Sequence, residues 1–225
     1  MSKEYSSFLN KSISVNSRTA SKDVFAGDPY PYESPDTTHF SVMDQYGNAV
    51  SNTYTLNFSY GSGIMIPGTG MLMNNEMDDF SSKPGVPNGY GLLGSEANSI
   101  EANKRPLSSM TPTIIFKDDK PYLVLGSPGG SRIITTVLQV ALNVMEHGMN
   151  VAQAVNSPRI HHQWLPETLM IEKGFGPDTE KLLQEKGYRL YPSSTMGSVQ
   201  AILKDGEYFY GAADPRRPGS GAVAP

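Results

Sequence analysis

The chain has 225 residues, a length that suits one large domain or two small ones and allows a sizeable apolar core. Its formal net charge of −4 and its lack of a long lysine or arginine cluster argue against nucleic-acid binding, and no run of about 18 apolar residues is present to span a membrane. Because the chain has no cysteine, disulfides, cysteine-ligated metals and thiol catalysis are excluded.

Residues 1–36 are predicted to form an extended segment rather than the start of a packed domain. They are rich in serine and lysine, and the N-terminus lacks the apolar stretch of a secretory signal. Pro29, Pro31 and Pro35 lie close together and favour an exposed strap. Exposed segments of this kind are places where a chain is readily cut.

A hairpin is predicted next, and it begins with a threonine of chemical interest. One run covers Thr37–Met43, a turn follows at residues 44–48, and a second run covers Ala49–Asn57. A threonine hydroxyl is a weak nucleophile unless a base lies beside it, and a free α-amine on the same residue can be that base. Thr37 has such an amine only if the chain is cut between Asp36 and Thr37. Taken alone, this stretch favours an ordinary hairpin with surface threonines, and later segments change that balance.

Two further hairpins are predicted in the second half of the chain. One joins Thr113–Phe116 to Tyr122–Leu125, and the other joins Val199–Leu203 to Tyr208–Tyr210 through an Asp-Gly turn. Residues 61–105 are dense in Gly, Asn, Asp and Pro, and a loop of that length is usually functional or disordered.

Three helices are predicted between and after these hairpins. Residues 131–147 have apolar positions at helical spacing and end at Gly148. A short helix follows Asn150, and another covers about residues 178–186. Hairpins mixed with amphipathic helices indicate a layered α+β fold with antiparallel sheets.

A glycine pair lies where a predicted strand meets the first of these helices. Gly129 and Gly130 can turn two backbone N–H groups toward one small anion, helped by the positive end of the helix dipole. That geometry suits an oxyanion hole for acyl transfer. A phosphate site is the competing interpretation, but no lysine follows in the required pattern. A tight turn without any ligand also stays open.

Three other polar groups have several interpretations each. The acidic run Asn74–Phe80 fits a calcium site, a capped surface turn or recognition of a substrate ammonium group, although its spacing is not that of an EF-hand. Ser108 and Ser109 offer two hydroxyls suited to a carboxylate. His161 and His162 point to opposite sides if extended, which favours packing over a metal site. We therefore expect no metal and no cofactor.

Together these stretches resemble the γ-glutamyltranspeptidase family. The similarity covers roughly residues 29–217, with several motifs in the family's order. They are Thr37-Thr38-His39, Gly47-Asn48-Ala49-Val50, Thr53–Asn57, Asn74–Phe80, Lys104–Met110, Gly126–Arg132, Pro158–Pro166 and Asp214-Pro215-Arg216.

The resemblance implies an N-terminal-nucleophile hydrolase fold, an αββα sandwich of two antiparallel sheets. It implies a precursor that cuts itself after Asp36, so that residues 1–36 are the tail of a large subunit and residues 37–225 are the small, catalytic subunit. The large subunit would then be the partner in a heterodimer. A periplasmic or secreted location is implied as well.

The resemblance also assigns roles to individual residues. Thr37 attacks the γ-glutamyl carbonyl of glutathione or a similar donor, and water or an amino-acid or dipeptide acceptor resolves the ester. Thr55 holds Thr37 in place, and Gly129 and Gly130 stabilise the oxyanion. The γ-glutamyl group is bound by a larger set: Asn57, Glu76 and Asp79 at its ammonium end, Ser108 and Ser109 at its carboxylate, and Tyr90 on a lid loop.

Two alternatives accompany this interpretation. The fold also serves relatives such as cephalosporin acylases and transpeptidases that process poly-γ-glutamate capsule. An uncut chain, in which the Thr37 amine is tied up in a peptide bond, would be catalytically silent.

Overall fold

The structure is a computed structural model that describes residues 13–20, 37–89, 92–193 and 195–224. The predicted proline-rich strap, the residue before the predicted cut (Asp36) and the predicted lid residue (Tyr90) lie outside these residues. Among the described residues, no helix has both the length and the apolar character needed to cross a membrane.

The hairpin that begins with Thr37 forms as predicted. Its strands are β1 (Thr37–Met43) and β2 (Ala49–Thr55), antiparallel and paired from Thr37 opposite Thr55 to Met43 opposite Ala49. Asp44 closes the turn by accepting hydrogen bonds from the backbone N–H groups of Tyr46 and Asn48.

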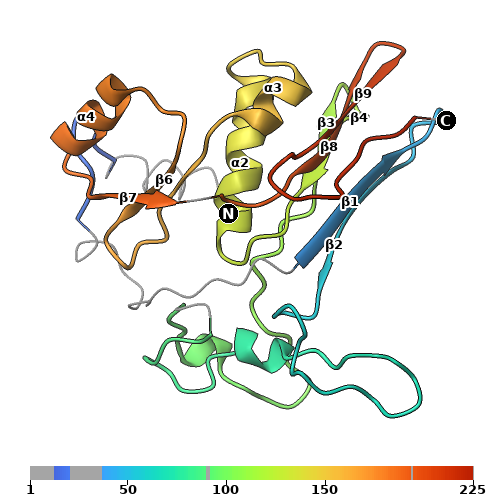
Figure 1. The fold of residues 1–225 in the computed structure, drawn as a ribbon, viewed down its shortest axis with the longest axis vertical. Coiled ribbons are helices and arrows are strands. Elements are labelled where there is room, and N and C mark those ends of the chain that lie inside the picture. Colours follow the sequence, from blue (N-terminus) through green and yellow to red (C-terminus); the bar gives the residue numbers. More distant parts are fainter. Residues whose placement is uncertain (1–12, 21–36, 90–91, 194, 225) are drawn as a thin grey trace.

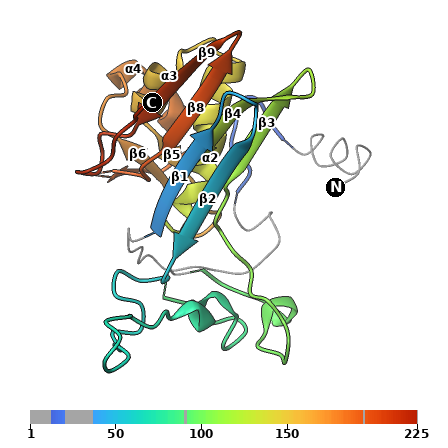
Figure 2. The same ribbon diagram turned by 90° about the vertical axis from the view of Figure 1, so that its right-hand side faces the viewer.

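The other two predicted hairpins combine into one antiparallel sheet. Its strands lie in the order β3 (Thr113–Lys117), β4 (Lys120–Gly126), β8 (Gln200–Asp205) and β9 (Tyr208–Ala213). The β1–β2 hairpin packs across the face of this sheet, over β4 and β8 (Figure 2). The two antiparallel layers of the expected sandwich are therefore present.

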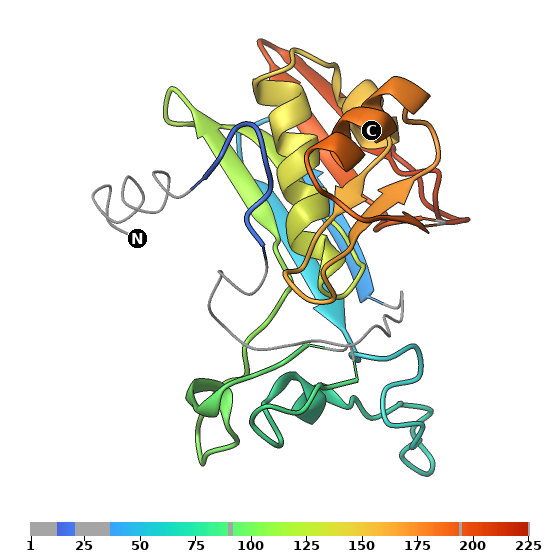
Figure 3. The same cartoon turned by 90° about the vertical axis from the view of Figure 1, so that its left-hand side faces the viewer.

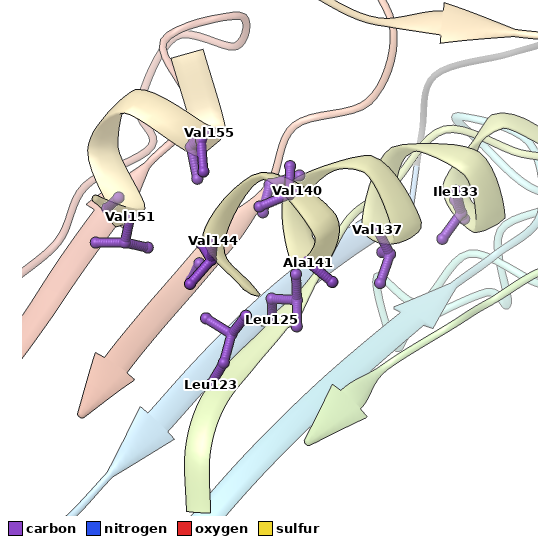
Figure 4. Close-up of a cluster of buried hydrophobic side chains, with 13 residues drawn as sticks. Leu123, Leu125, Ile133, Val137, Val140, Ala141, Val144, Val151 and Val155 are labelled. Carbon is purple, nitrogen blue, oxygen red and sulfur yellow. The ribbon is translucent and has the colours of Figure 1, made fainter. Parts of the chain in front are cut away.

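Helices cover the opposite face of the four-stranded sheet (Figures 1 and 3). They are α2 (Arg132–Met145) and α3 (Val151–Asn156), and both were predicted. Asn150 caps α3: its side chain accepts from the Gln153 backbone, and the Gln153 side chain accepts from the Asn150 backbone. The core lies between these helices and β4 and β8 (Figure 4), and its main members are Leu123, Leu125, Ile133, Val137, Val140, Val144, Val151, Val155 and Val199.

The apolar surface of α2 is wider than the sheet can cover. Ile133 and Val137 are buried, whereas Ile134, Leu138 and Met145 are about half exposed. Exposed apolar positions at helical spacing indicate a second packing surface on the outer side of α2.

A small third sheet was not predicted. It consists of β5 (Ile160–His161), β6 (Leu169–Glu172) and β7 (Leu190–Ser193), and β6 pairs with β7 in parallel. Helix α4 (Pro177–Glu185), predicted at about residues 178–186, connects β6 to β7.

The loop between β2 and β3 forms a separate lobe beneath the sandwich (Figure 1). It contains two short 3₁₀ helices, η2 (Glu76–Asp79) and η3 (Glu96–Asn98). Side chains tie it together: the Asn98 amide donates to the Asp79 carbonyl, and the Asn88 amide donates to the Asp78 carbonyl. The long predicted loop is thus ordered by local polar contacts in its described part.

Candidate active site

Thr37 lies at the buried start of β1. Its exposed fraction is 6%, so it is not a surface threonine. Its hydroxyl is 3.2 Å from the Thr55 hydroxyl, directly across the hairpin. Arg217, near the end of the described chain, donates to the Thr37 carbonyl at 2.9 Å. The residue is therefore held on both its side-chain and its backbone side.

The β1–β2 hairpin has an inverted distribution of polar side chains. The face toward the four-stranded sheet carries hydroxyls and an imidazole: Thr37, His39, Ser41, Ser51, Thr53 and Thr55. The opposite face exposes large apolar side chains: Phe40, Val42, Val50 and Tyr54. An interior polar layer beside a candidate nucleophile is a feature of a site, since packing alone favours apolar residues there.

His39 connects this polar layer to the neighbouring sheet. Its ring lies 2.7 Å from the Thr53 hydroxyl and 3.0 Å from the Ser41 hydroxyl, and it occupies the space that a side chain at Gly126 would need. Burial lowers the pKa of His39 to about 4, so the imidazole is neutral at physiological pH. No feature of the sequence alone indicated this contact, because Gly126 lies 87 positions away in the chain.

Thr55 also reaches toward the acidic loop. Its hydroxyl accepts a hydrogen bond from the Asn57 backbone N–H at 2.8 Å. Asn57 is 3% exposed, has a left-handed backbone with φ of 74°, and donates its side-chain amide to the Asn75 carbonyl at 3.1 Å. A continuous set of contacts thus links Thr37 to the residue immediately before Glu76.

Glu76 and Asp79 form a close carboxyl pair in η2. They share a side-chain hydrogen bond, and Glu76 Oε1 is buried without a hydrogen-bond partner among the described residues. Burial, and then the charge of Asp79, raises the pKa of Glu76 to about 7. Burial also raises the pKa of Asp79. Two neighbouring carboxyl groups of this kind, once ionised, can bind a cation.

The two serines predicted to bind a carboxylate have different surroundings in the structure. Ser109 lines a cavity of about 130 Å³ together with Asp78 and Asp79, whereas Ser108 is exposed and accepts a hydrogen bond from the Met110 backbone. Ser109 thus shares a cavity with Asp79, one member of the acidic pair.

Gly129 and Gly130 lie between β4 and α2, as predicted. Both have positive φ, 138° and 57°, and their carbonyls accept hydrogen bonds from the Arg132 and Ile133 N–H groups. Within the described ranges, no hydrogen bond engages the N–H of either glycine. Pro128 lines a groove of about 420 Å³ with Thr38, His39 and Arg217, which places this turn beside the start of β1.

The paired histidines have different surroundings. His161 is buried, with Nδ1 2.7 Å from the Thr135 hydroxyl and Nε2 3.0 Å from Gln163 Oε1, and burial lowers its pKa to about 4. His162 contacts Tyr188 edge to face. No group of histidine and acidic residues in the described part of the chain has the arrangement of a metal site.

Comparison with known proteins identifies one family. The family model for gamma-glutamyltranspeptidase matches residues 1–224. The glutathione hydrolase proenzyme of Escherichia coli (strain K12) is 56% identical over 216 residues, which are 95% of this chain and 37% of that protein. The chain therefore spans a little over a third of the length of this curated relative.

Solved structures share the fold. A Helicobacter pylori γ-glutamyltranspeptidase T380A mutant is 58% identical with a TM-score of 0.77, and the match covers 80% of this chain and 100% of that chain. A cephalosporin acylase from Bacillus halodurans matches at 25% identity with a TM-score of 0.75, over 96% of this chain and 37% of that chain.

Proposed function

The chain belongs to the γ-glutamyltranspeptidase family, and we propose that it is the catalytic portion of a self-cleaving γ-glutamyl transferase and hydrolase. The observation that carries this proposal is the placement of Thr37: it is the buried first residue of β1, its hydroxyl contacts the Thr55 hydroxyl, and it is linked through Thr55 and Asn57 to the acidic loop. A cut between Asp36 and Thr37 gives this threonine the free amine that its chemistry needs.

The reaction follows from the groups around Thr37. The freed α-amine takes the hydroxyl proton, and Oγ1 attacks the γ-glutamyl carbonyl. The N–H groups of Gly129 and Gly130 stabilise the negative oxygen of the tetrahedral intermediate. The leaving amine takes the proton, and a γ-glutamyl ester remains on Thr37. Water or an amino-acid or dipeptide acceptor then attacks this ester and regenerates the threonine.

The donor is recognised by both ends of its glutamyl group. Asn57, Glu76 and Asp79 bind the α-ammonium, and Ser108 and Ser109 bind the α-carboxylate. The buried, unpartnered Glu76 Oε1 supports this assignment, because a carboxylate oxygen without a donor is costly unless a cation completes the site. Glutathione and related γ-glutamyl compounds are the proposed donors.

The remainder of the precursor is the proposed partner. The outer face of the β1–β2 hairpin exposes an edge-to-face pair, Phe40 and Tyr54, with Val42 and Val50 beside it. Among the described strands, β1 pairs only with β2, so its other edge is open. An apolar face and an open edge suit a helical layer and a further strand supplied by that partner, as in an αββα sandwich. A periplasmic or secreted location is part of the same proposal.

A related acylase is the second candidate function, since the cephalosporin acylase shares the fold. One assay separates the two. The complete precursor, once cut, should release the chromophore from a γ-glutamyl anilide faster when an acceptor dipeptide is added. The matched glutaryl anilide lacks only the α-ammonium and should be a poor substrate. Equal rates with both anilides would favour the acylase, and no release from either would refute the proposed enzyme.

Donor binding is expected to depend on pH through Glu76. A bound ammonium group needs an ionised carboxylate, so the Michaelis constant of the donor should fall as the pH rises through about 7. The effect on folding stability has the opposite sign. Because the pKa of Glu76 is raised from 4.5 to about 7, its contribution to the free energy of unfolding is fully present below pH 4.5. This contribution is lost as the pH rises through about 7.

The measurement is the pH profile of kcat/KM, which reports the free enzyme. Glu76→Gln should flatten the part of the pH profile near pH 7 that reflects donor binding. Glu96→Gln is the matched control: Glu96 is an exposed carboxylate in η3 of the same loop, and the profile should keep its shape. A Glu76→Gln profile identical to that of the wild type contradicts the assignment.

A further inference from the structure

Ser127 lies directly before the glycine turn and is fully buried, with an exposed fraction of 0%. Its hydroxyl donates to the Pro128 carbonyl at 2.6 Å and accepts from the Ser198 backbone N–H at 2.8 Å. Both hydrogen-bonding capacities that a hydroxyl commonly uses are therefore satisfied by backbone groups. One partner belongs to the glycine turn, and the other belongs to a second turn, residues 196–199.

The Pro128 carbonyl is the important partner. It belongs to the same planar peptide unit as the Gly129 N–H, and in a trans peptide these two groups point in opposite directions. A hydrogen bond that holds the carbonyl toward Ser127 therefore aims the Gly129 N–H away from Ser127. Without the hydroxyl, this peptide unit loses the contact that fixes its rotation.

The two turns pack backbone to backbone. A Cβ atom added at Gly197, whose φ is +70°, would lie 2.5 Å from Ser127 Oγ and 2.9 Å from a Thr136 methyl carbon. A Cβ atom added at Gly129 would lie 3.3 Å from the Gly197 Cα atom. No side chain fits between the turns, so a displacement of one is transmitted directly to the other.

Buried charges anchor the second turn at both ends. The Met196 N–H donates to Glu172 at 2.6 Å, and the Met196 carbonyl accepts from Arg159 at 2.5 Å. At the other end, the Val199 N–H donates to Asp214 at 2.9 Å. Three ion pairs complete the cluster: Arg159 with Asp214 at 2.6 Å, and Arg216 with both Glu172 at 2.7 Å and Asp214 at 3.1 Å. Because the charges are paired and bonded, this cluster favours one arrangement of the turn.

We propose that Ser127 is a positioning residue for the reaction: its hydroxyl, supported by residues 196–199, fixes the orientation of the Pro128–Gly129 peptide and aims the Gly129 N–H at the oxyanion. The inference rests on the proposed function, because it needs an oxyanion at this turn. A donor misaligned by an ångström stabilises the transition state much less but barely alters substrate binding, since the negative oxygen forms only during reaction.

The test compares Ser127→Ala with Ser157→Ala in the complete, cut enzyme. Ser157 is the control, because its hydroxyl also donates to a backbone carbonyl (Gln153, 2.9 Å) but lies at the C-terminal end of α3, outside the residues assigned to the site. Ser127→Ala should lower kcat about 10- to 100-fold with a change in KM below about threefold. Ser157→Ala should lose some thermal stability with a nearly unchanged kcat.

A second readout separates positioning from general damage. A boronic acid analogue of the γ-glutamyl group, which forms a tetrahedral adduct with a hydroxyl nucleophile, should bind Ser127→Ala more weakly by the same factor as the loss of kcat. Glutamate, a trigonal product, should inhibit both variants and the wild type alike. Equal weakening of both inhibitors, or a kcat equal to that of Ser157→Ala, overturns the inference.

Self-cleavage could fail in Ser127→Ala, so Ser127→Cys is a second variant with similar volume and a weak donor. Its kcat should lie between those of wild type and alanine, and a normal kcat overturns the inference. If both variants stay uncut, their unfolding in urea is measured. An unfolding transition like that of the wild type supports a role of the turn in cleavage, whereas an unfolded chain shows a structural role only. An inactive wild type would instead refute the proposed function.

Discussion

Thr37→Ala should give a single uncut chain without γ-glutamyl transfer or hydrolysis. Two functions are removed together, since the Thr37 hydroxyl is the proposed nucleophile both for self-cleavage and for the donor. The buried position of Thr37 means that no neighbouring hydroxyl can simply replace it: Thr55 lies 3.2 Å away but carries no chain terminus after a cut. Activity should fall to background in the anilide assay, and mass spectrometry should find only the intact precursor.

Thr37→Ser is the matched variant, because it keeps the hydroxyl and loses only the methyl group. It should be cut between Asp36 and the new serine and should retain measurable turnover. N-terminal sequencing of the wild-type product completes the experiment. A small chain that begins anywhere other than Thr37, or a cut Thr37→Ala chain, would contradict the proposal that Thr37 is the nucleophile.

Local patterns in the sequence were enough to predict most of the fold. The Asp-Gly turn at Asp205 and Gly206 does lead from β8 into β9, and the helix predicted to end at Gly148 ends at Met145. These elements depend on neighbours in the chain, which a sequence pattern records. The sheet of β5, β6 and β7 was missed because its strands are short and pair across an intervening helix.

The contacts at the candidate site could not be predicted for the same reason, because they join residues that are far apart in the chain. The resemblance names the glycine turn and the acidic loop, but not the contacts that orient them. Ser127 meets Ser198 across 71 positions, and Arg159 meets Asp214 across 55. Such contacts depend on the final packing of the chain, so neither composition nor spacing indicates them. The inverted polarity of the β1–β2 hairpin was equally hidden, because alternation alone does not say which face is buried.

The second large effect is expected at Gly130. Its backbone is left-handed, with φ of 57°, a conformation that alanine can adopt at a cost of roughly 1–2 kcal/mol. Relief of that strain rotates the turn and moves the Gly130 N–H from its position. Gly130→Ala should therefore fold but lower kcat about 100- to 1000-fold, which is the typical effect of losing one oxyanion donor. Donor affinity should change little, because the negative oxygen exists only near the transition state.

Gly148→Ala provides the matched control at the other end of α2. Its φ is 65°, and an added Cβ atom would meet nothing within 4 Å, so alanine imposes similar backbone strain far along the helix from the turn. Cleavage must be verified first by mass spectrometry, because an uncut chain would also be inactive. With both variants cut, the ratio of their kcat values separates the loss of oxyanion stabilisation from the effect of backbone strain. If Gly130→Ala turns over as fast as Gly148→Ala, the glycine pair is only a turn and the oxyanion donors lie elsewhere.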